Sequence, residues 1–195
     1  MSDQSFTAEN TAMLLIDHQV GTMGWVRSIS FDDLKANALA LAKAARGLNI
    51  PLVLTSSMEN HAQGPLLSEL EEIAPAEHAA RIQRQGVVNA FDDKNFAAAV
   101  EATGRRKLIV AGVTNDVCTV FPTVSALRDG YEVQVVADAG GSPTALADQI
   151  ALRRMEHAGA TITSTNQLLA ELAGNWTGPE GAAIMPIVLS LMPQQ

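Results

Sequence analysis

This chain of 195 residues has little cysteine, little positive charge and no long apolar run. Its single cysteine cannot form an internal disulfide, which is typical of proteins from a reducing compartment. The net charge of −8 argues against a nucleic-acid partner, because such binding depends on clustered lysines and arginines. No apolar run reaches the ~20 residues that a membrane span needs, and residues 1–7 lack a signal-peptide pattern. We therefore expect a cytoplasmic protein with no membrane and no nucleic-acid partner.

The composition favours one folded domain over residues 1–195. Hydrophobic residues make up 47% of the chain and charged residues 17%, a balance that supports a sizeable core without disordered tracts. No internal repeat, low-complexity tract or linker divides the sequence.

Apolar runs typical of buried strands alternate with stretches of helical period. Strands are expected at residues 11–16, 51–55, within 78–84, and at 107–113, 131–137 and 160–163. Helices are expected after caps at Ser30, at Asp92 or Asp93 and at Thr144, and from Cys118 to residue 128. The alternation predicts an α/β protein, a three-layer α/β/α sandwich around a mainly parallel, six-stranded, doubly wound sheet.

Polar residues follow the ends of these strands. Asp17 follows the first strand, Arg84 the third and Cys118 the fourth. In open α/β sheets ligands bind at the carboxyl ends of the strands, where the strand order reverses. The architecture therefore predicts that three groups far apart in sequence meet at one edge of the sheet.

Cys118 is the candidate nucleophile. It lies where the chain turns from a buried strand into a helix, and the helix dipole with its unpaired N–H groups would lower the thiol pKa. The same N–H groups would hold the oxyanion of an attacked carbonyl. The alternative is an inert core residue, as free cysteines often are.

Asp17 and Arg84 are the candidate partners of this thiol. Asp17 would act as general base, taking the thiol proton and returning it to a leaving amine, with burial raising its pKa toward the working range. Its alternative role is a helix or turn cap. Arg84 would stabilise the thiolate and hold the Asp17 carboxylate, and the alternative is an ordinary surface arginine.

Four residues flank the strand ends and are candidates for lining the substrate pocket: Gln19, Glu59, Asn89 and Phe91. The four histidines show no metal-ligand spacing, and no Walker loop, Gly-x-Gly-x-x-Gly or Gly-x-Ser-x-Gly motif is present. We expect a small-molecule substrate, no metal and no cofactor.

With these residues in place, the chain resembles the isochorismatase-like cysteine hydrolases, most closely the YcaC-like subgroup. The resemblance rests on five segments, Leu14-Leu-Ile-Asp-His-Gln19, Thr55-Ser-Ser-Met-Glu59, Arg84-Gln-Gly-Val-Val-Asn-Ala-Phe91, Ile109-Val-Ala-Gly-Val-Thr-Asn-Asp-Val-Cys118 and Val135-Val-Ala-Asp-Ala139. It implies an α/β/α sandwich and an Asp17–Arg84–Cys118 triad acting on C–N bonds, typically of amides or ureas. It also implies a cis peptide bond at Val113–Thr114, with the N–H groups of Thr114 and Cys118 forming an oxyanion hole.

Two differences between this sequence and the wider family bear on the expected activity. Nicotinamidases have a lysine where this chain has Arg84, and arginine there is similar to the YcaC-like subgroup. Nicotinamidases also bind a metal through an Asp-x-His pattern after the second strand, which Ser56-Ser-Met-Glu-Asn-His61 does not match. Isochorismatases proper cleave a vinyl ether and can lack the cysteine, so Cys118 favours amide chemistry.

The C-terminal segment, residues 178–195, contains an apolar run at residues 182–192. The run is too short to span a bilayer and too apolar to lie exposed on a monomer, so we expect it to pack across a subunit interface. Resemblance to the YcaC-like subgroup implies a ring-based homo-octamer.

Two other functions stay open at this point. One is a cysteine redox or aldehyde sensor on the same fold, which reacts without turnover. The other is a scaffold whose triad is vestigial.

Overall fold

The structure is a computed structural model that describes residues 5–193, and its centre is one six-stranded sheet. The strands are β1 (Thr11–Ile16), β2 (Leu52–Ser57), β3 (Ile82–Arg84), β4 (Lys107–Gly112), β5 (Glu132–Val136) and β6 (Thr161–Thr163). Their order is β3-β2-β1-β4-β5-β6, and every neighbouring pair is parallel. The predicted doubly wound α/β sheet is confirmed.

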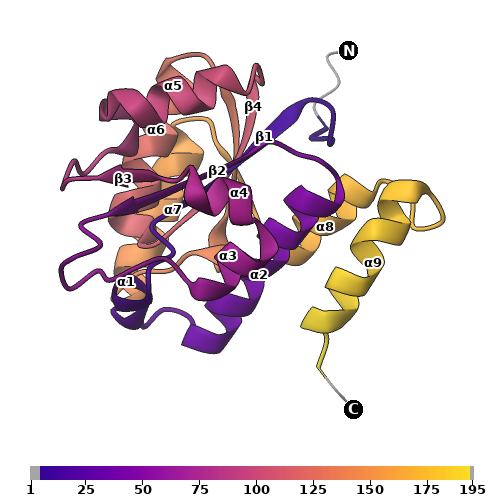
Figure 1. Cartoon of the computed structure of the whole chain (residues 1–195), viewed down its shortest axis with the longest axis horizontal. Coiled ribbons are helices and arrows are strands. Elements are labelled where there is room, and N and C mark those ends of the chain that lie inside the picture. The colour runs from indigo at the N-terminus through magenta and orange to yellow at the C-terminus, as the bar shows by residue number, and fades with distance from the viewer. Residues whose placement is uncertain (1–4, 194–195) are drawn as a thin grey trace.

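Helices cover both faces of the sheet (Figure 1). They are α1 (Val20–Gly24), α2 (Phe31–Gly47), α3 (Ser68–Ile73), α4 (Pro75–Ala79), α5 (Lys94–Ala102), α6 (Val120–Arg128), α7 (Ala145–His157), α8 (Thr165–Ala173) and α9 (Pro179–Leu191). The core on one face is built with α2, α3 and α8, and the core on the other face with α5, α6 and α7. These layers form the predicted α/β/α sandwich.

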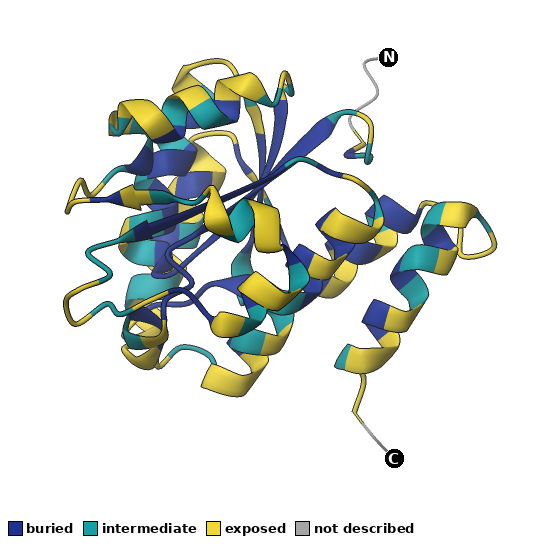
Figure 2. Ribbon diagram, viewed as in Figure 1, coloured by how far each residue is buried: buried dark blue, intermediate teal, exposed yellow. Residues whose placement is uncertain are grey.

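Strand β1 shows why the central strands read as continuous apolar runs. Met13 and Leu15 face the α2 and α8 side, whereas Leu14 and Ile16 face the α5 to α7 side. Both sets are buried, because a parallel sheet covered on both faces leaves no strand side in water. Figure 2 shows the central strands as the buried layer of the molecule.

The predicted helix caps are confirmed at three places. The Ser30 hydroxyl accepts a hydrogen bond from Asp33 N at 3.1 Å, and Thr144 accepts one from Ala147 N at 3.1 Å. Asp93, rather than Asp92, caps α5. Each cap satisfies a backbone N–H that would otherwise have no partner in the first turn.

The C-terminal run forms helix α9, which packs on α2 and α8. Ile184, Ile187 and Val188 are buried there, so the chain itself covers one face of the run, and the expected packing of the run across a subunit interface stays a prediction. The opposite face leaves Leu189 and Met192 exposed, at 58% and 41%. Residues 194–195 of the expected interface segment lie outside the described residues. No helix within residues 5–193 is long and apolar enough to cross a membrane.

The strand order reverses between β1 and β4, which are neighbours at the centre of the sheet. Chain segments leaving these two strands diverge to opposite faces, and this opens a crevice at their carboxyl ends. Asp17 directly follows β1, and the segment containing Cys118 follows β4.

Candidate active site

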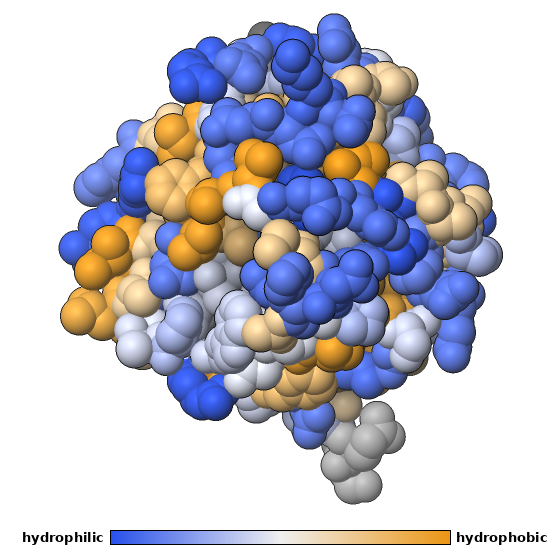
Figure 3. All heavy atoms as spheres, turned by 60° about the vertical axis from the view of Figure 1, so that its left-hand side comes forward, coloured by the Kyte–Doolittle hydropathy of each residue, from blue (hydrophilic) through white to orange (hydrophobic). Residues whose placement is uncertain are grey.

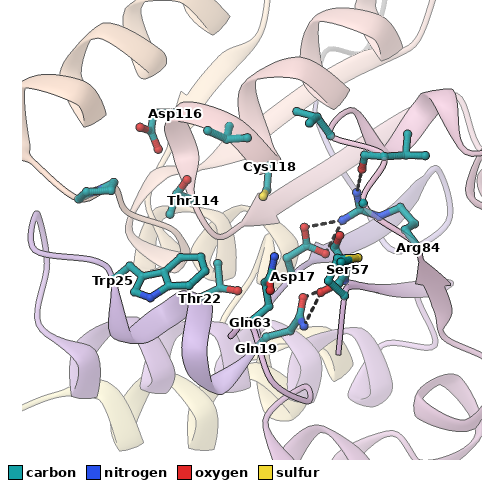
Figure 4. A pocket seen from close by; sticks show the side chains of 16 residues that line it. Asp17, Gln19, Thr22, Trp25, Ser57, Gln63, Arg84, Thr114, Asp116 and Cys118 are labelled. Atoms are coloured by element: carbon teal, nitrogen blue, oxygen red, sulfur yellow. Dashed lines mark hydrogen bonds and ion pairs between the residues drawn. The ribbon is translucent and has the colours of Figure 1, made fainter. Parts of the chain in front are cut away.

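Asp17, Arg84 and Cys118 meet in one cavity of about 330 Å³ (Figure 4). Asp17 has a φ of 59°, in the left-handed region that aspartate tolerates better than most residues, and its N–H donates to Thr55 O at 2.9 Å. Arg84 is the last residue of β3 and reaches past β2 toward Asp17. The convergence predicted from the strand ends is therefore present.

Arg84 and Asp17 form a buried ion pair. The Arg84 Nη2 group donates to both carboxylate oxygens of Asp17, and the two side chains are 1% and 2% exposed. Arg84 Nε donates to Thr55 Oγ1 at 3.1 Å, and Nη1 donates to Val87 O at 2.6 Å. These contacts exclude the alternative of a surface arginine. Thr55, which fixes the guanidinium, lies in the Thr55–Glu59 segment of the family resemblance, but sequence reasoning did not predict its contact with Arg84.

The thiol of Cys118 lies close enough to the Asp17 carboxyl group for each to shift the pKa of the other. Burial raises the pKa of Asp17, and the neighbouring Arg84 charge opposes that rise. Burial also raises the pKa of Cys118, and the negative charge of Asp17 raises it further. The expectation of a lowered thiol pKa is therefore wrong, because burial and the neighbouring carboxyl group both disfavour the thiolate.

Cys118 lies in a π-helical turn, Asn115–Thr119, between β4 and α6, rather than in the first turn of an α-helix. The Val113–Thr114 peptide bond is cis, as the family resemblance implied. The Thr114 N–H opposes the rise of the Cys118 pKa, which places at least one expected oxyanion-hole donor near the sulfur.

The π-helical turn is anchored to the segment that follows β5. Asn115 N donates to Gly141 O at 2.7 Å, and Asn115 Nδ2 donates to Ala137 O at 3.1 Å and to Asp148 Oδ1 at 3.0 Å. Gly140 lies so close that an added Cβ would be 2.2 Å from Asn115 Oδ1. Sequence reasoning assigned no positioning role to these residues, although Asn115 and Ala137 lie in segments that carry the family resemblance.

Of the four residues expected to line the substrate pocket, only Gln19 lies on the cavity. Its side chain is held by the backbone, since Nε2 donates to Ser57 O at 2.9 Å and Oε1 accepts from Ser57 N at 2.8 Å. Glu59 pairs with Arg81 at 2.7 Å.

Asn89 and Phe91 also point elsewhere. Asn89 Nδ2 donates to Ser125 Oγ at 3.0 Å, and the Phe91 ring packs edge-on against Phe96 with centroids 5.4 Å apart. Closeness to a strand end in sequence does not decide where a side chain points, and these two, like Glu59, do not line the cavity.

The rest of the cavity wall comes from helix α1 and from loops, several of which lie within the segments that carry the family resemblance. The further residues that line it are Thr22, Trp25, Ser57, Met58, Gln63, Gly86, Val87, Val88, Thr114, Asp116, Val117 and Pro143. Most of these side chains are apolar or uncharged.

His18 is next to Asp17 in sequence but has a different role. It is fully buried, and its Nε2 lies 2.8 Å from Ala139 O. Burial lowers the pKa of His18 to about 4, so the ring is neutral and donates to that carbonyl. Among residues 5–193 no group of three or more His, Cys, Asp or Glu side chains is arranged to hold a metal ion.

Comparison with known proteins agrees with this geometry. The isochorismatase domain family matches residues 11–167. Probable hydrolase YcaC of Escherichia coli (strain K12) is 40% identical over 177 residues, which are 90% of this chain and 84% of that protein.

Two solved structures superpose over nearly the whole chain. Escherichia coli YcaC, described as an octameric hydrolase of unknown specificity, matches with a TM-score of 0.93, 36% identity and coverage of 99% of this chain and 93% of that chain. Pseudomonas aeruginosa YcaC, described with hexane-2,5-diol and covalent acrylamide, matches with a TM-score of 0.90, 39% identity and coverage of 98% and 95%. This chain therefore belongs to the isochorismatase family of hydrolases, in its YcaC-like subgroup.

Proposed function

We propose that this protein is a cysteine hydrolase that cleaves a small-molecule amide, or another non-peptide C–N bond, through a thioester on Cys118. The observation that carries the proposal is the chain of contacts from Arg84 to Asp17 to the Cys118 thiol, with the Thr114 N–H near the same sulfur. Nucleophile, base, orienting cation and N–H donor lie together in one cavity, which is the arrangement that acyl transfer needs.

The geometry supports the following sequence of steps. Cys118 Sγ attacks the carbonyl carbon as Asp17 takes the thiol proton, and the oxyanion is held by the N–H groups of Thr114 and Cys118. The adduct collapses when Asp17 gives its proton to the leaving nitrogen, which departs as ammonia or an amine. A water molecule then attacks the thioester while Asp17 takes its proton. Release of the acid returns the proton to the thiol.

Arg84 has a positioning role in this scheme. It donates to both Asp17 oxygens, which fixes the carboxylate, and its charge limits the rise of the Asp17 pKa that burial causes. A base whose pKa is raised only in part can both accept and return a proton near neutral pH. Arginine keeps its own proton throughout.

The alternative of a redox or aldehyde sensor is disfavoured by the state of the thiol. Sensor cysteines are thiolates of low pKa, whereas burial and Asp17 raise the pKa of Cys118. A raised pKa suits a thiol that is deprotonated by its neighbour only as it attacks. The covalent acrylamide described for Pseudomonas aeruginosa YcaC indicates a nucleophile in that relative, and we propose Cys118 as its counterpart here.

The test is release of ammonia or amine from a panel of small amides and carbamoyl compounds. The wild-type chain is expected to hydrolyse at least one, Cys118→Ala none, and Asp17→Asn at a rate lower by about 100-fold or more. Asp129→Asn, an exposed site at the end of α6, is the matched control for loss of one negative charge. Equal hydrolysis by the Cys118→Ala and wild-type chains would contradict the proposal.

We also propose a homo-octamer, as described for Escherichia coli YcaC, with α9 contributing to a subunit contact. The support is the exposed outer face of α9, where Leu189 and Met192 leave apolar surface in water. Sedimentation velocity is expected to give an octamer for the wild-type chain and smaller species for Leu189→Lys. A monomeric wild-type chain would contradict this.

A further inference from the structure

Among the described residues that line the cavity, no positively charged side chain is free to bind an anionic substrate. Arg84 is the one cationic side chain among these described residues. Its guanidinium donates to Asp17, to Thr55 Oγ1 and to Val87 O, so each of its nitrogens already has a partner. A substrate carboxylate would have to compete with Asp17 for this arginine.

A second carboxylate, that of Asp116, also lines the cavity. In Figure 4 it lies on the opposite side of Cys118 from Arg84. Its Oδ1 is buried and accepts no hydrogen bond from any residue that the structure describes. Because Asp17 and Arg84 neutralise each other, the Asp116 charge is the uncompensated one in the wall. In a partly desolvated site it repels an anionic ligand much more strongly than it would in water.

The rest of the wall suits an uncharged molecule with an apolar part. Trp25, Val87, Val88 and Val117 line the cavity with exposed fractions of 46%, 38%, 56% and 37%, so they are open to contact. In Figure 3, which brings the left-hand side of Figure 1 to the front, apolar side chains form patches within the hydrophilic surface. Thr22 supplies an uncharged hydrogen-bonding group, since its Oγ1 is buried and has no partner among residues 5–193.

We infer that the cavity selects small, uncharged amides with an apolar substituent and rejects anionic ones, with Asp116 as the discriminating residue. This inference names the substrate class of the proposed hydrolase and so rests on that function. A volume of about 330 Å³ fits a compact ligand.

The test uses two alkylating reagents of nearly equal size, neutral iodoacetamide and anionic iodoacetate. Because Cys118 is the single cysteine, its modification is read directly from intact mass. Both reagents meet the same thiol at the same pH, so the thiolate fraction cancels in the ratio of their rates. The same ratio measured with 2-mercaptoethanol corrects for the intrinsic reactivity of each reagent.

The corrected ratio is expected to favour iodoacetamide by about tenfold or more in the wild-type chain. Asp116→Asn is expected to reduce the preference severalfold, Asp116→Glu to keep it, and Asp129→Asn, with the same change in net charge, to leave it unaltered. A corrected ratio within twofold of one, or a ratio that Asp116→Asn does not change, would overturn the inference. So would failure of both reagents to reach the native thiol.

The outcome is separable from that of the proposed hydrolysis. A chain that discriminates between the reagents but releases ammonia from no amide keeps the charge selectivity and loses the hydrolase. A chain that hydrolyses anionic amides as fast as neutral ones keeps the hydrolase and loses the selectivity.

Discussion

Replacing Arg84 by methionine tests whether the ion pair beneath the nucleophile is as buried as the structure has it. The two side chains are 1% and 2% exposed, so removing the guanidinium leaves the Asp17 carboxylate buried without its cation. Breaking a buried pair from one side costs about 3–5 kcal/mol of unfolding free energy, against about 0–1 kcal/mol for an exposed pair. We expect Arg84→Met to lose about 3–5 kcal/mol of unfolding free energy, as for a buried pair. Arg46→Met is the matched control, because Arg46 pairs with Glu77 at 2.8 Å but is 51% exposed.

The pH dependence of this loss has a definite sign. Burial already raises the Asp17 pKa above its ordinary value of 3.8, and removal of Arg84 raises it further. An acid whose pKa is raised by folding favours the folded chain fully below the unfolded-state pKa and loses that contribution as the pH rises through the folded-state pKa. The loss of unfolding free energy caused by Arg84→Met is therefore expected to be largest near pH 7 and to shrink toward about pH 4.

Urea unfolding followed by circular dichroism, at one protein concentration for all variants, measures these free energies. Asp17→Asn and the double variant complete a cycle, and the double variant is expected to recover ~2 kcal/mol or more of the Arg84→Met loss. The reasoning is refuted if Arg84→Met loses no more than Arg46→Met, or if the two changes in the cycle are additive.

Two further predictions concern the nucleophile. Asp17→Asn removes the negative charge that helps to raise the Cys118 pKa. The pH profile of iodoacetamide alkylation is therefore expected to move to lower pH, while the rate of amide hydrolysis falls. A profile that stays in place or moves to higher pH would show that Asp17 does not act on the thiol. Gly140→Ala places a Cβ 2.2 Å from Asn115 Oδ1, so it is expected to lower the melting temperature and slow the alkylation of Cys118. Gly24→Ala is the control, because a Cβ there meets nothing within 4 Å. Equal effects of the two changes would contradict the account.

The sequence was sufficient for the fold and for the meeting of Asp17, Arg84 and Cys118. Continuous apolar runs such as that of β1 predict a sheet covered on both faces, and the rule that ligands bind at the carboxyl ends of parallel strands then brings the three residues together.

The cavity wall was not predictable in the same way. Helix α1 and the loop that includes Gln63 hold each other through backbone contacts, such as Gly21 N to Gln63 O at 2.9 Å. Such contacts between distant segments leave no periodicity in sequence. Glu59 was misplaced for the same reason, since its partner Arg81 approaches from another segment. The thiol pKa depends on burial by those segments, so its direction also required the folded structure.

The central claim is that Cys118 attacks the substrate and carries its acyl group. The most direct test is intact-protein mass spectrometry after acid quench during turnover of a small neutral amide, with peptide mapping of any adduct. The account predicts an acyl adduct on Cys118 that is absent in Cys118→Ser and decays as the acid is released. Sustained release of ammonia or amine by Cys118→Ala at the wild-type rate, with no adduct at any time, would contradict it.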